Sequence, residues 1–265
     1  VIPLLLEYRS LSNLIHNFTQ SLPKYLNPIT NRLHPSWFQI GAKSGRFSCR
    51  YPNLTNIPRQ PRFRRCFIPA PNHVFLKADY SQIELRIIAL ICNDSRMIEA
   101  YSHGLDLHSL TASQLFNLPI DDVTPEQRQL GKIVNFGFIY GMGVKLFRLQ
   151  TAKIHHIFLS QQEASQFRRV FFHTYRGIRL FHERTRQQWL QGCRVSYTLD
   201  GRRRIWSKKR PPTLNELLNH PVQGTNASII KQAMINIGQH LSRFDARLVI
   251  VVHDEIDLEF GSLRI

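Results

Sequence analysis

Residues 74–91 change their sequence period halfway along, and this constrains the fold more than any other stretch. Apolar side chains first alternate, which predicts a β-strand, at Val74, Leu76 and Ala78. After Asp79 the apolar residues recur at helical spacing, with Ser81 as the expected N-cap and Glu84 at the reciprocal capping-box position. The carboxylate of Asp79 is therefore expected at the C-terminal edge of a strand, where ligands and metals gather. A plain strand-to-helix turn is the alternative, because Asp and Ser favour turns for backbone reasons alone.

A second strand-like segment, residues 248–252, is apolar throughout and leads into an acidic tip. The tip consists of His253, Asp254 and Glu255, and an alternating segment follows it, which predicts a β-hairpin over 248–260. Acidic residues in such a bend are commonly only solvated, but this incoming strand is apolar on both faces, as in a buried sheet. Carboxylates on neighbouring strands can hold two divalent cations about 3.5–4 Å apart. That arrangement serves in-line phosphoryl transfer.

Residues 124–141 predict a helix with a clear start signal: a Thr cap, Pro at the first position and Gln at the capping-box position. Four side chains spaced four residues apart then share one third of its surface: Arg128, Lys132, Phe136 and Tyr140. Two cations followed by two aromatic rings suit a phosphate tail followed by a sugar and base, although an amphipathic helix with a mixed face is the alternative. Gly131 and Gly137 each cost about 1 kcal/mol relative to Ala, which indicates a close approach or a bend.

The charge of the chain favours polyanionic partners. Its 265 residues include 35 basic and 18 acidic ones, a net charge of +17. A basic face that only aids solubility is the alternative. The 43% of hydrophobic residues suffices for one large domain or two lobes. The four cysteines lack zinc spacing and predict reduced thiols in an intracellular protein, and no apolar run is long enough to predict a membrane span.

Two regions concentrate the basic residues. Residues 41–65 predict a long irregular segment whose polar side chains could grip a nucleic-acid backbone, or simply be solvated: Lys43, Arg46, Arg50, Asn53, Arg59, Arg62, Arg64 and Arg65. The second basic region is residues 202–210, which follow a predicted strand at 195–199 and a predicted tight turn at Asp200-Gly201. Helices are also expected over 4–18, 101–116, 161–189 and 215–218, with an interruption at Pro221 before another long helix. Gln223 lies near the start of that helix, where its amide could contact a base edge.

Six segments, in this order, resemble the family A DNA polymerases, the bacterial DNA polymerase I family. Motifs A, B and C of the family resemble residues 79–86, residues 128–141 and residues 252–255. The other three are Ser44-Gly45-Arg46 with residues 52–58, residues 201–204 and residues 221–225. The resemblance implies an α+β right-hand fold with an antiparallel palm sheet and helical fingers. The implied parts are the end of a thumb-like region (1–30), palm (31–95), fingers (96–192, with the motif B helix at 125–141) and palm again (193–265).

The resemblance also implies roles for individual residues in DNA-templated DNA synthesis with two Mg²⁺ ions, for which Mn²⁺ can substitute. Metal ligands would be Asp79, Asp254 and the Tyr80 carbonyl, and Glu255 would support them. Residues implied to bind or select the nucleotide are Tyr80, Glu84 (the steric gate against ribonucleotides), His108, Arg128, Lys132, Phe136 and Tyr140, with Lys132 also assisting catalysis. Residues implied to contact primer–template DNA are Arg46, Asn53, Arg59, Gln223 and His253.

The sequence departs from the family pattern at its ends. Only the end of a thumb-like region is recognised and no exonuclease domain precedes it, so we expect no proofreading and weak DNA grip without further domains or a processivity partner. A cytoplasmic, nucleoid-associated location is expected, with phage or organelle origins left open. A catalytically impaired DNA-binding remnant and a two-metal nuclease are the alternatives. The intact acidic and cationic residues count against the first, and the triphosphate-binding helix counts against the second.

Overall fold

The computed structural model describes residues 2–58, 60–241, 243–244, 246–252 and 255–261, with the backbone alone described from 246 onward. The chain divides into two compact units, Val1–Ser81 with Ala227–Ile265 and Gln82–Asn226, here called unit 1 and unit 2. The structure is mostly helical with small antiparallel sheets. This agrees with the expected α+β class.

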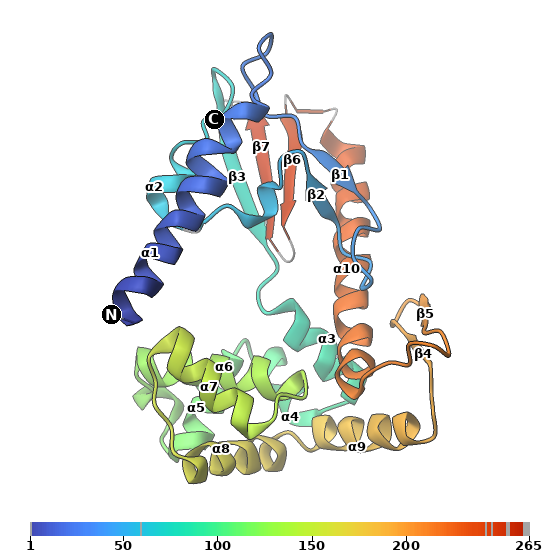
Figure 1. Cartoon of the computed structure of the whole chain (residues 1–265). Helices are drawn as coiled ribbons and strands as arrows, with labels where there is room; N and C mark the ends of the chain where they lie inside the picture. The colour runs from blue at the N-terminus through green and yellow to red at the C-terminus, as the bar shows by residue number, and fades with distance from the viewer. Residues whose placement is uncertain (1, 59, 242, 245, 253–254, 262–265) are drawn as a thin grey trace. The chain divides into compact units, whose positions relative to one another are not determined.

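The sheet of unit 1 joins an early strand to a late hairpin (Figure 1). Its antiparallel order is β3–β7–β6, formed by β3 (His73–Asp79), β6 (Ala246–Val252) and β7 (Glu255–Gly261). The predicted strand ending at Asp79 and the predicted hairpin are both confirmed. The register pairs His73 with Gly261 and Asp79 with Glu255, so the end of β3 lies beside the start of β7.

The rest of unit 1 consists of short elements and part of one long helix. They are α1 (Ile2–Leu14), a π-helical segment (Ile15–Gln20), 3-10 turns (Leu22–Tyr25 and Leu54–Asn56), β1 (Ser36–Phe38), β2 (Ser48–Arg50), α2 (Pro61–Arg64) and the C-terminal part of α10 (Leu214–Leu241). Ile230 of α10 is buried against Phe47 and three apolar neighbours on its own helix. The helix predicted over 4–18 forms, but its apolar stripe is not buried: Leu4 is 70% and Tyr8 69% exposed.

Unit 2 is a helical body with one small hairpin. Its elements are α3 (Ile83–Cys92), α4 (Ser95–Ser102), α5 (Leu107–Phe116), a 3-10 turn (Ile120–Asp122), α6 (Pro125–Ile139), α7 (Val144–His155), α8 (Gln161–Thr174), α9 (Arg176–Leu190), β4 (Val195–Tyr197), β5 (Arg203–Ile205) and the start of α10. Aromatic rings form much of its core: the centroid of Phe138 lies 4.7 Å from that of Phe147 and 5.7 Å from that of Phe171. In the part of the chain that the structure describes, no helix could cross a membrane.

The structure corrects several expected helix boundaries. Helix α3 begins at Ile83, and its N-cap is Gln82, which adopts a left-handed conformation (φ 55°) and makes no side-chain capping hydrogen bond. The expectation of Ser81 as the N-cap is therefore wrong. The helix expected over 101–116 is two helices, because Asp106 caps a new one. The helix expected over 161–189 is likewise divided at Tyr175. Pro221 does not interrupt α10, which continues through it.

Candidate active site

The candidate metal site is at the end of β3. Asp79 is the last residue of the strand, and the exposed Tyr80 follows it. Glu255 begins β7 directly opposite Asp79, whereas Asp254 and His253 lie outside the described residues. Among the described side chains, no group of three His, Cys, Asp or Glu residues is placed to hold a metal ion. The backbone register therefore brings together the two strand ends, while the complete ligand set is not among the described side chains.

Six of the seven nucleotide-binding candidates are in unit 2, and Tyr80 is in unit 1. Helix α6 carries three of them, Arg128, Lys132 and Phe136, and Tyr140 is its C-cap residue. The predicted capping box is confirmed: the Thr124 hydroxyl accepts from the Gln127 backbone N–H at 3.3 Å, and the Gln127 side chain accepts from the Thr124 N–H at 2.9 Å. This capping box fixes where the helix begins. Lys132 is exposed, and Phe136 and the C-cap residue Tyr140 are half-buried.

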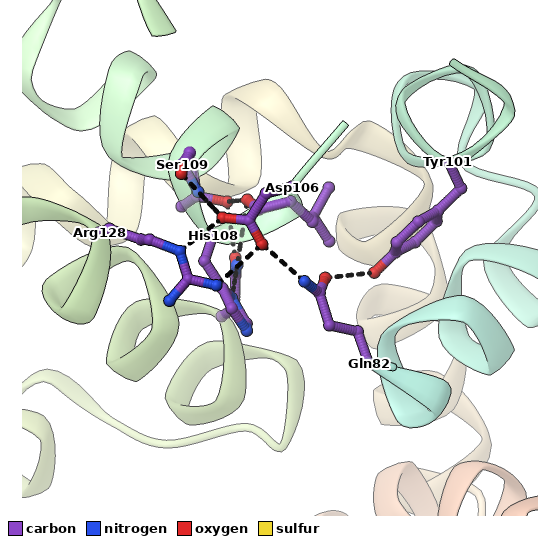
Figure 2. Close-up of polar contacts among 9 residues, drawn as sticks. Gln82, Tyr101, Asp106, His108, Ser109 and Arg128 are labelled. Carbon is purple, nitrogen blue, oxygen red and sulfur yellow. Dashed lines mark hydrogen bonds and ion pairs between the residues drawn. The ribbon is translucent and has the colours of Figure 1, made fainter. Parts of the chain in front are cut away.

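Arg128 is held by a carboxylate that precedes the neighbouring helix (Figure 2). Its Nε donates to Asp106 Oδ2 at 2.9 Å, and its Nη2 donates to Asp106 Oδ1 at 3.1 Å. Asp106 also caps α5 by accepting from the backbone N–H and hydroxyl of Ser109, both at 2.8 Å. A guanidinium has five N–H donors, so three remain for a phosphate while this fork is intact. The ion pair orients Arg128 and leaves it able to bind an anion.

The network extends from Asp106 to the turn after β3. The Gln82 side-chain amide donates to Asp106 Oδ1 at 2.6 Å, and the Tyr101 hydroxyl donates to Gln82 Oε1 at 3.1 Å (Figure 2). Burial alone would raise the pKa of Asp106, but hydrogen bonds from Ser109, Arg128 and Gln82 outweigh it and lower the pKa to about 2. The carboxylate therefore stays ionised across the neutral range.

His108 lies at the start of α5, close to this network but buried, with 3% of its surface exposed. Its ring centroid is 5.9 Å from that of Phe136. Burial lowers the pKa of His108 to about 4; the charge of Asp106 opposes this shift, and those of Arg128 and Lys132 add to it. His108 is therefore a neutral side chain at pH 7. The family resemblance implied a position for His108 near Arg128 and Lys132, and the charges of both side chains act on its ring.

Glu84 and Tyr140 are joined by a hydrogen bond from the tyrosine hydroxyl to the carboxylate. Glu84 is in the first turn of α3 and only 7% exposed, and Tyr140 ends α6. The carboxylate that the family resemblance assigns to sugar selection is thus tied to the ring that it assigns to the template base.

The candidate DNA contacts belong to different elements of both units. Arg46 is half-buried between β1 and β2, and Gln223 is half-buried in α10. Asn53 caps a 3-10 turn, where its side-chain oxygen accepts from the backbone N–H of Thr55 at 3.1 Å. Arg59, like His253, lies outside the described residues.

The sequence patterns assigned no role to Asp106 or Gln82. The spacing Asp106-x-x-Ser109 before an apolar helix was a usable N-cap signal. Gln82 and Arg128, which also donate to Asp106, lie 24 and 22 residues away from it, and no local pattern indicates them.

Comparisons with known proteins agree with the resemblance in sequence. The sequence profile of DNA polymerase family A matches residues 1–263. DNA polymerase I of Pseudomonas aeruginosa is 39% identical over 96% of this chain, and the thermostable DNA polymerase I of Thermus aquaticus is 35% identical over 98%. The chain spans only 29% and 32% of the length of those two proteins.

A solved structure of the POL domain of Pol1 from M. smegmatis, in complex with DNA primer-template and dNTP, matches with a TM-score of 0.86 and 33% identity. The match covers 98% of this chain and 47% of that one. The chain therefore belongs to DNA polymerase family A.

Proposed function

We propose that this chain carries the catalytic centre of a DNA-templated DNA polymerase, which adds deoxynucleotides to a primer 3′-hydroxyl. The observation that carries the proposal is the sheet register, which pairs Asp79 with Glu255 at the meeting point of two segments far apart in sequence. Membership of the family and the primer-template and dNTP in the M. smegmatis complex support it. We retain the palm, fingers and thumb-like divisions given above as part of this proposal.

The donor set proposed for the metal site fits Mg²⁺. Asp79, Asp254 and the Tyr80 carbonyl would supply hard oxygen ligands, which Mg²⁺ prefers, with Glu255 as a supporting acid and Mn²⁺ as a substitute. Two bound ions would favour deprotonation of the primer hydroxyl and offset charge on the leaving pyrophosphate. The register of β3 and β7 supports this choice, because it places the strand end that carries Asp79 beside the residue that follows Asp254.

We assign the nucleotide to the face of α6. Arg128 keeps three donors beyond its ion pair with Asp106, and Lys132 is exposed four residues later, so both can bind phosphate oxygens. Lys132 can also supply positive charge or a proton to the pyrophosphate as the bond to the α-phosphorus breaks. Phe136 packs on the sugar and base, Tyr140 near the template base, and Glu84 closes the space at the sugar 2′ position.

The proposed DNA contacts complete the assignment. Arg46 and Gln223 probe the minor groove near the primer terminus, and Asn53, Arg59 and His253 contact the DNA. The net charge of +17 supports capture of DNA by long-range attraction. The named relatives are bacterial, and we place the protein with the nucleoid in the cytoplasm.

One assay tests the proposal against its alternatives. A labelled primer–template is incubated with the protein and Mg²⁺, with and without deoxynucleotides, and again with excess chelator. Extension that needs both Mg²⁺ and deoxynucleotides is expected. Binding without extension would identify an impaired remnant, and shortening of the primer without nucleotides would identify a nuclease.

A further inference from the structure

Four buried side chains link the helix boundary at Tyr175 to His108 through a chain of hydrogen bonds. Tyr175, Thr111 and Asn135 are 0%, 1% and 0% exposed, and His108 is 3% exposed. The Tyr175 hydroxyl lies 2.7 Å from Thr111 Oγ1, Thr111 Oγ1 lies 2.8 Å from Asn135 Oδ1, and Asn135 Nδ2 lies 3.1 Å from His108 Nδ1. Such a chain in the core of a helical unit needs an explanation beyond packing.

The direction of donation along this chain can be derived. The Leu107 carbonyl oxygen, which can only accept, lies 3.4 Å from Asn135 Nδ2, so the amide nitrogen must face that side. The amide oxygen then faces Thr111 and accepts from it. Thr111 has one proton for two acceptors, Asn135 and the Leu107 carbonyl at 2.8 Å, so its oxygen accepts from Tyr175. Burial raises the pKa of Tyr175, which keeps its proton for this bond.

We propose that Asn135 is a positioning residue that holds His108 as the neutral tautomer with its proton on Nε2. Asn135 Nδ2 donates to His108 Nδ1, so Nδ1 must be the lone-pair nitrogen. The other nitrogen, Nε2, has no hydrogen-bond partner among the described residues, and it presents a donor without carrying a charge. This inference rests on the proposed function for its ligand, a phosphate oxygen of the incoming nucleotide.

The surroundings explain why the neutral tautomer suits this position. The charged groups that act on the ring are Asp106, Arg128 and Lys132, two cations and one anion. A protonated ring would add a third cation at the N-terminal end of α5, where the helix dipole disfavours it. The opposite neutral tautomer would aim a lone pair at a phosphate oxygen and repel it. Only the tautomer that Asn135 selects adds a donor without adding charge.

Nuclear magnetic resonance tests the tautomer without any activity. In protein labelled with ¹⁵N-histidine, two-bond ¹H–¹⁵N correlations distinguish the two neutral forms and the cation, and His108→Gln identifies the His108 signals. The wild-type ring is expected to have an unprotonated Nδ1 and a protonated Nε2 at pH 7. A wild-type ring protonated on Nδ1 would overturn the proposal, whether or not the protein extends primers.

Two near-isosteric variants test the role of the amide. Asn135→Asp replaces the hydrogen-bond donor with an acceptor, so Nδ1 of His108 should become protonated. The KM for deoxynucleotides should then rise about tenfold, which corresponds to the loss of one hydrogen bond to a charged group, and kcat should change less. The pH profile of KM for Asn135→Asp should show a titration step that the wild-type profile lacks. Thr111→Val is the matched control: the Leu107 carbonyl still orients the amide, so the tautomer should persist and KM should stay within about twofold.

Three results would contradict the role of Asn135. One is a wild-type tautomer in Asn135→Asp, and another is an equal rise in KM in both variants, which would indicate a packing effect. The third is a changed tautomer with an unchanged KM, which would show that the His108 ring does not contribute to nucleotide binding. Absence of primer extension by the wild-type protein would instead count against the proposed function, and the spectra would still decide the tautomer.

Discussion

Asp79 on β3 lies directly opposite Glu255 on β7 in the register of the unit 1 sheet. The same residue, Glu255, pairs with Val252 on β6, so the end of β6 lies at the same end of the sheet as Asp79. Strand pairing alone thus brings together two acidic segments that are far apart in the sequence. It gives the proposed metal site a rigid support, because neighbouring antiparallel strands keep a fixed spacing of about 4.7–4.9 Å.

Glu84→Ala should admit ribonucleotides. The carboxylate is buried and bonded to the Tyr140 hydroxyl, and its removal opens space beside α6. The ratio of ribonucleotide to deoxynucleotide incorporation, measured in single-nucleotide extension, should rise about ten- to hundredfold. Tyr140→Phe removes the hydrogen bond but keeps the carboxylate, so its ratio should change less. An unchanged ratio in Glu84→Ala would show that Glu84 does not select the sugar and has a structural role instead.

Asp106→Asn should lower stability in a manner that depends on pH. The folded-state pKa of Asp106 is about 2, below the usual value for Asp of about 3.9. The ionised carboxylate therefore stabilises the fold above about pH 4, and this contribution is lost as the pH falls towards 2. Urea unfolding at several pH values should show a smaller free energy of unfolding for the variant at pH 7, and a weaker dependence between pH 4 and 2. The exposed Asp121→Asn is the control, and equal behaviour of the two variants would contradict the assignment.

Gly131→Ala should destabilise unit 2. A Cβ at this position would lie 2.3 Å from the His108 carbonyl oxygen and 3.1 Å from the Ala112 backbone nitrogen, so α5 and α6 would have to separate. Overpacking of this kind costs about 1–3 kcal/mol, which thermal or urea unfolding can measure.

Gly238→Ala is the matched control for that substitution. Gly238 is also helical, in α10, but a Cβ added there would meet nothing within 4 Å. The control should be more stable than the wild type by up to about 1 kcal/mol, because Ala is the better helix former. Stabilisation by both substitutions would show that α5 and α6 do not need the close approach at Gly131.

Features set by local chemistry were predictable from the sequence. The capping box at Thr124 forms as expected, because its partners lie within one helical turn. The hairpin at 246–261 follows from its apolar run and alternation. For Gly131 the sequence left open a close approach or a bend, and the structure shows the close approach, to the His108 carbonyl, which the sequence did not identify.

Features that depend on distant partners were not predictable. Ser81 and Glu84 satisfy the capping-box pattern, yet Gln82 caps α3 and Glu84 bonds to Tyr140, 56 residues away. Pro221 was expected to break α10, but the helix continues through it. In each case a tertiary contact or the surrounding packing overrides a local preference.

We propose above all that Asp79 and Asp254 act together as metal ligands. The most direct test is the single-turnover rate of primer extension with Mg²⁺ for Asp79→Ala, Asp254→Ala and the double variant, with DNA affinity measured in parallel and Asp121→Ala as the control. Each single variant is expected to lose at least about a thousandfold in rate, the double variant is expected to be no slower than the slower single one, and DNA affinity should be largely kept. Extension at the wild-type rate by either single variant would contradict this proposal.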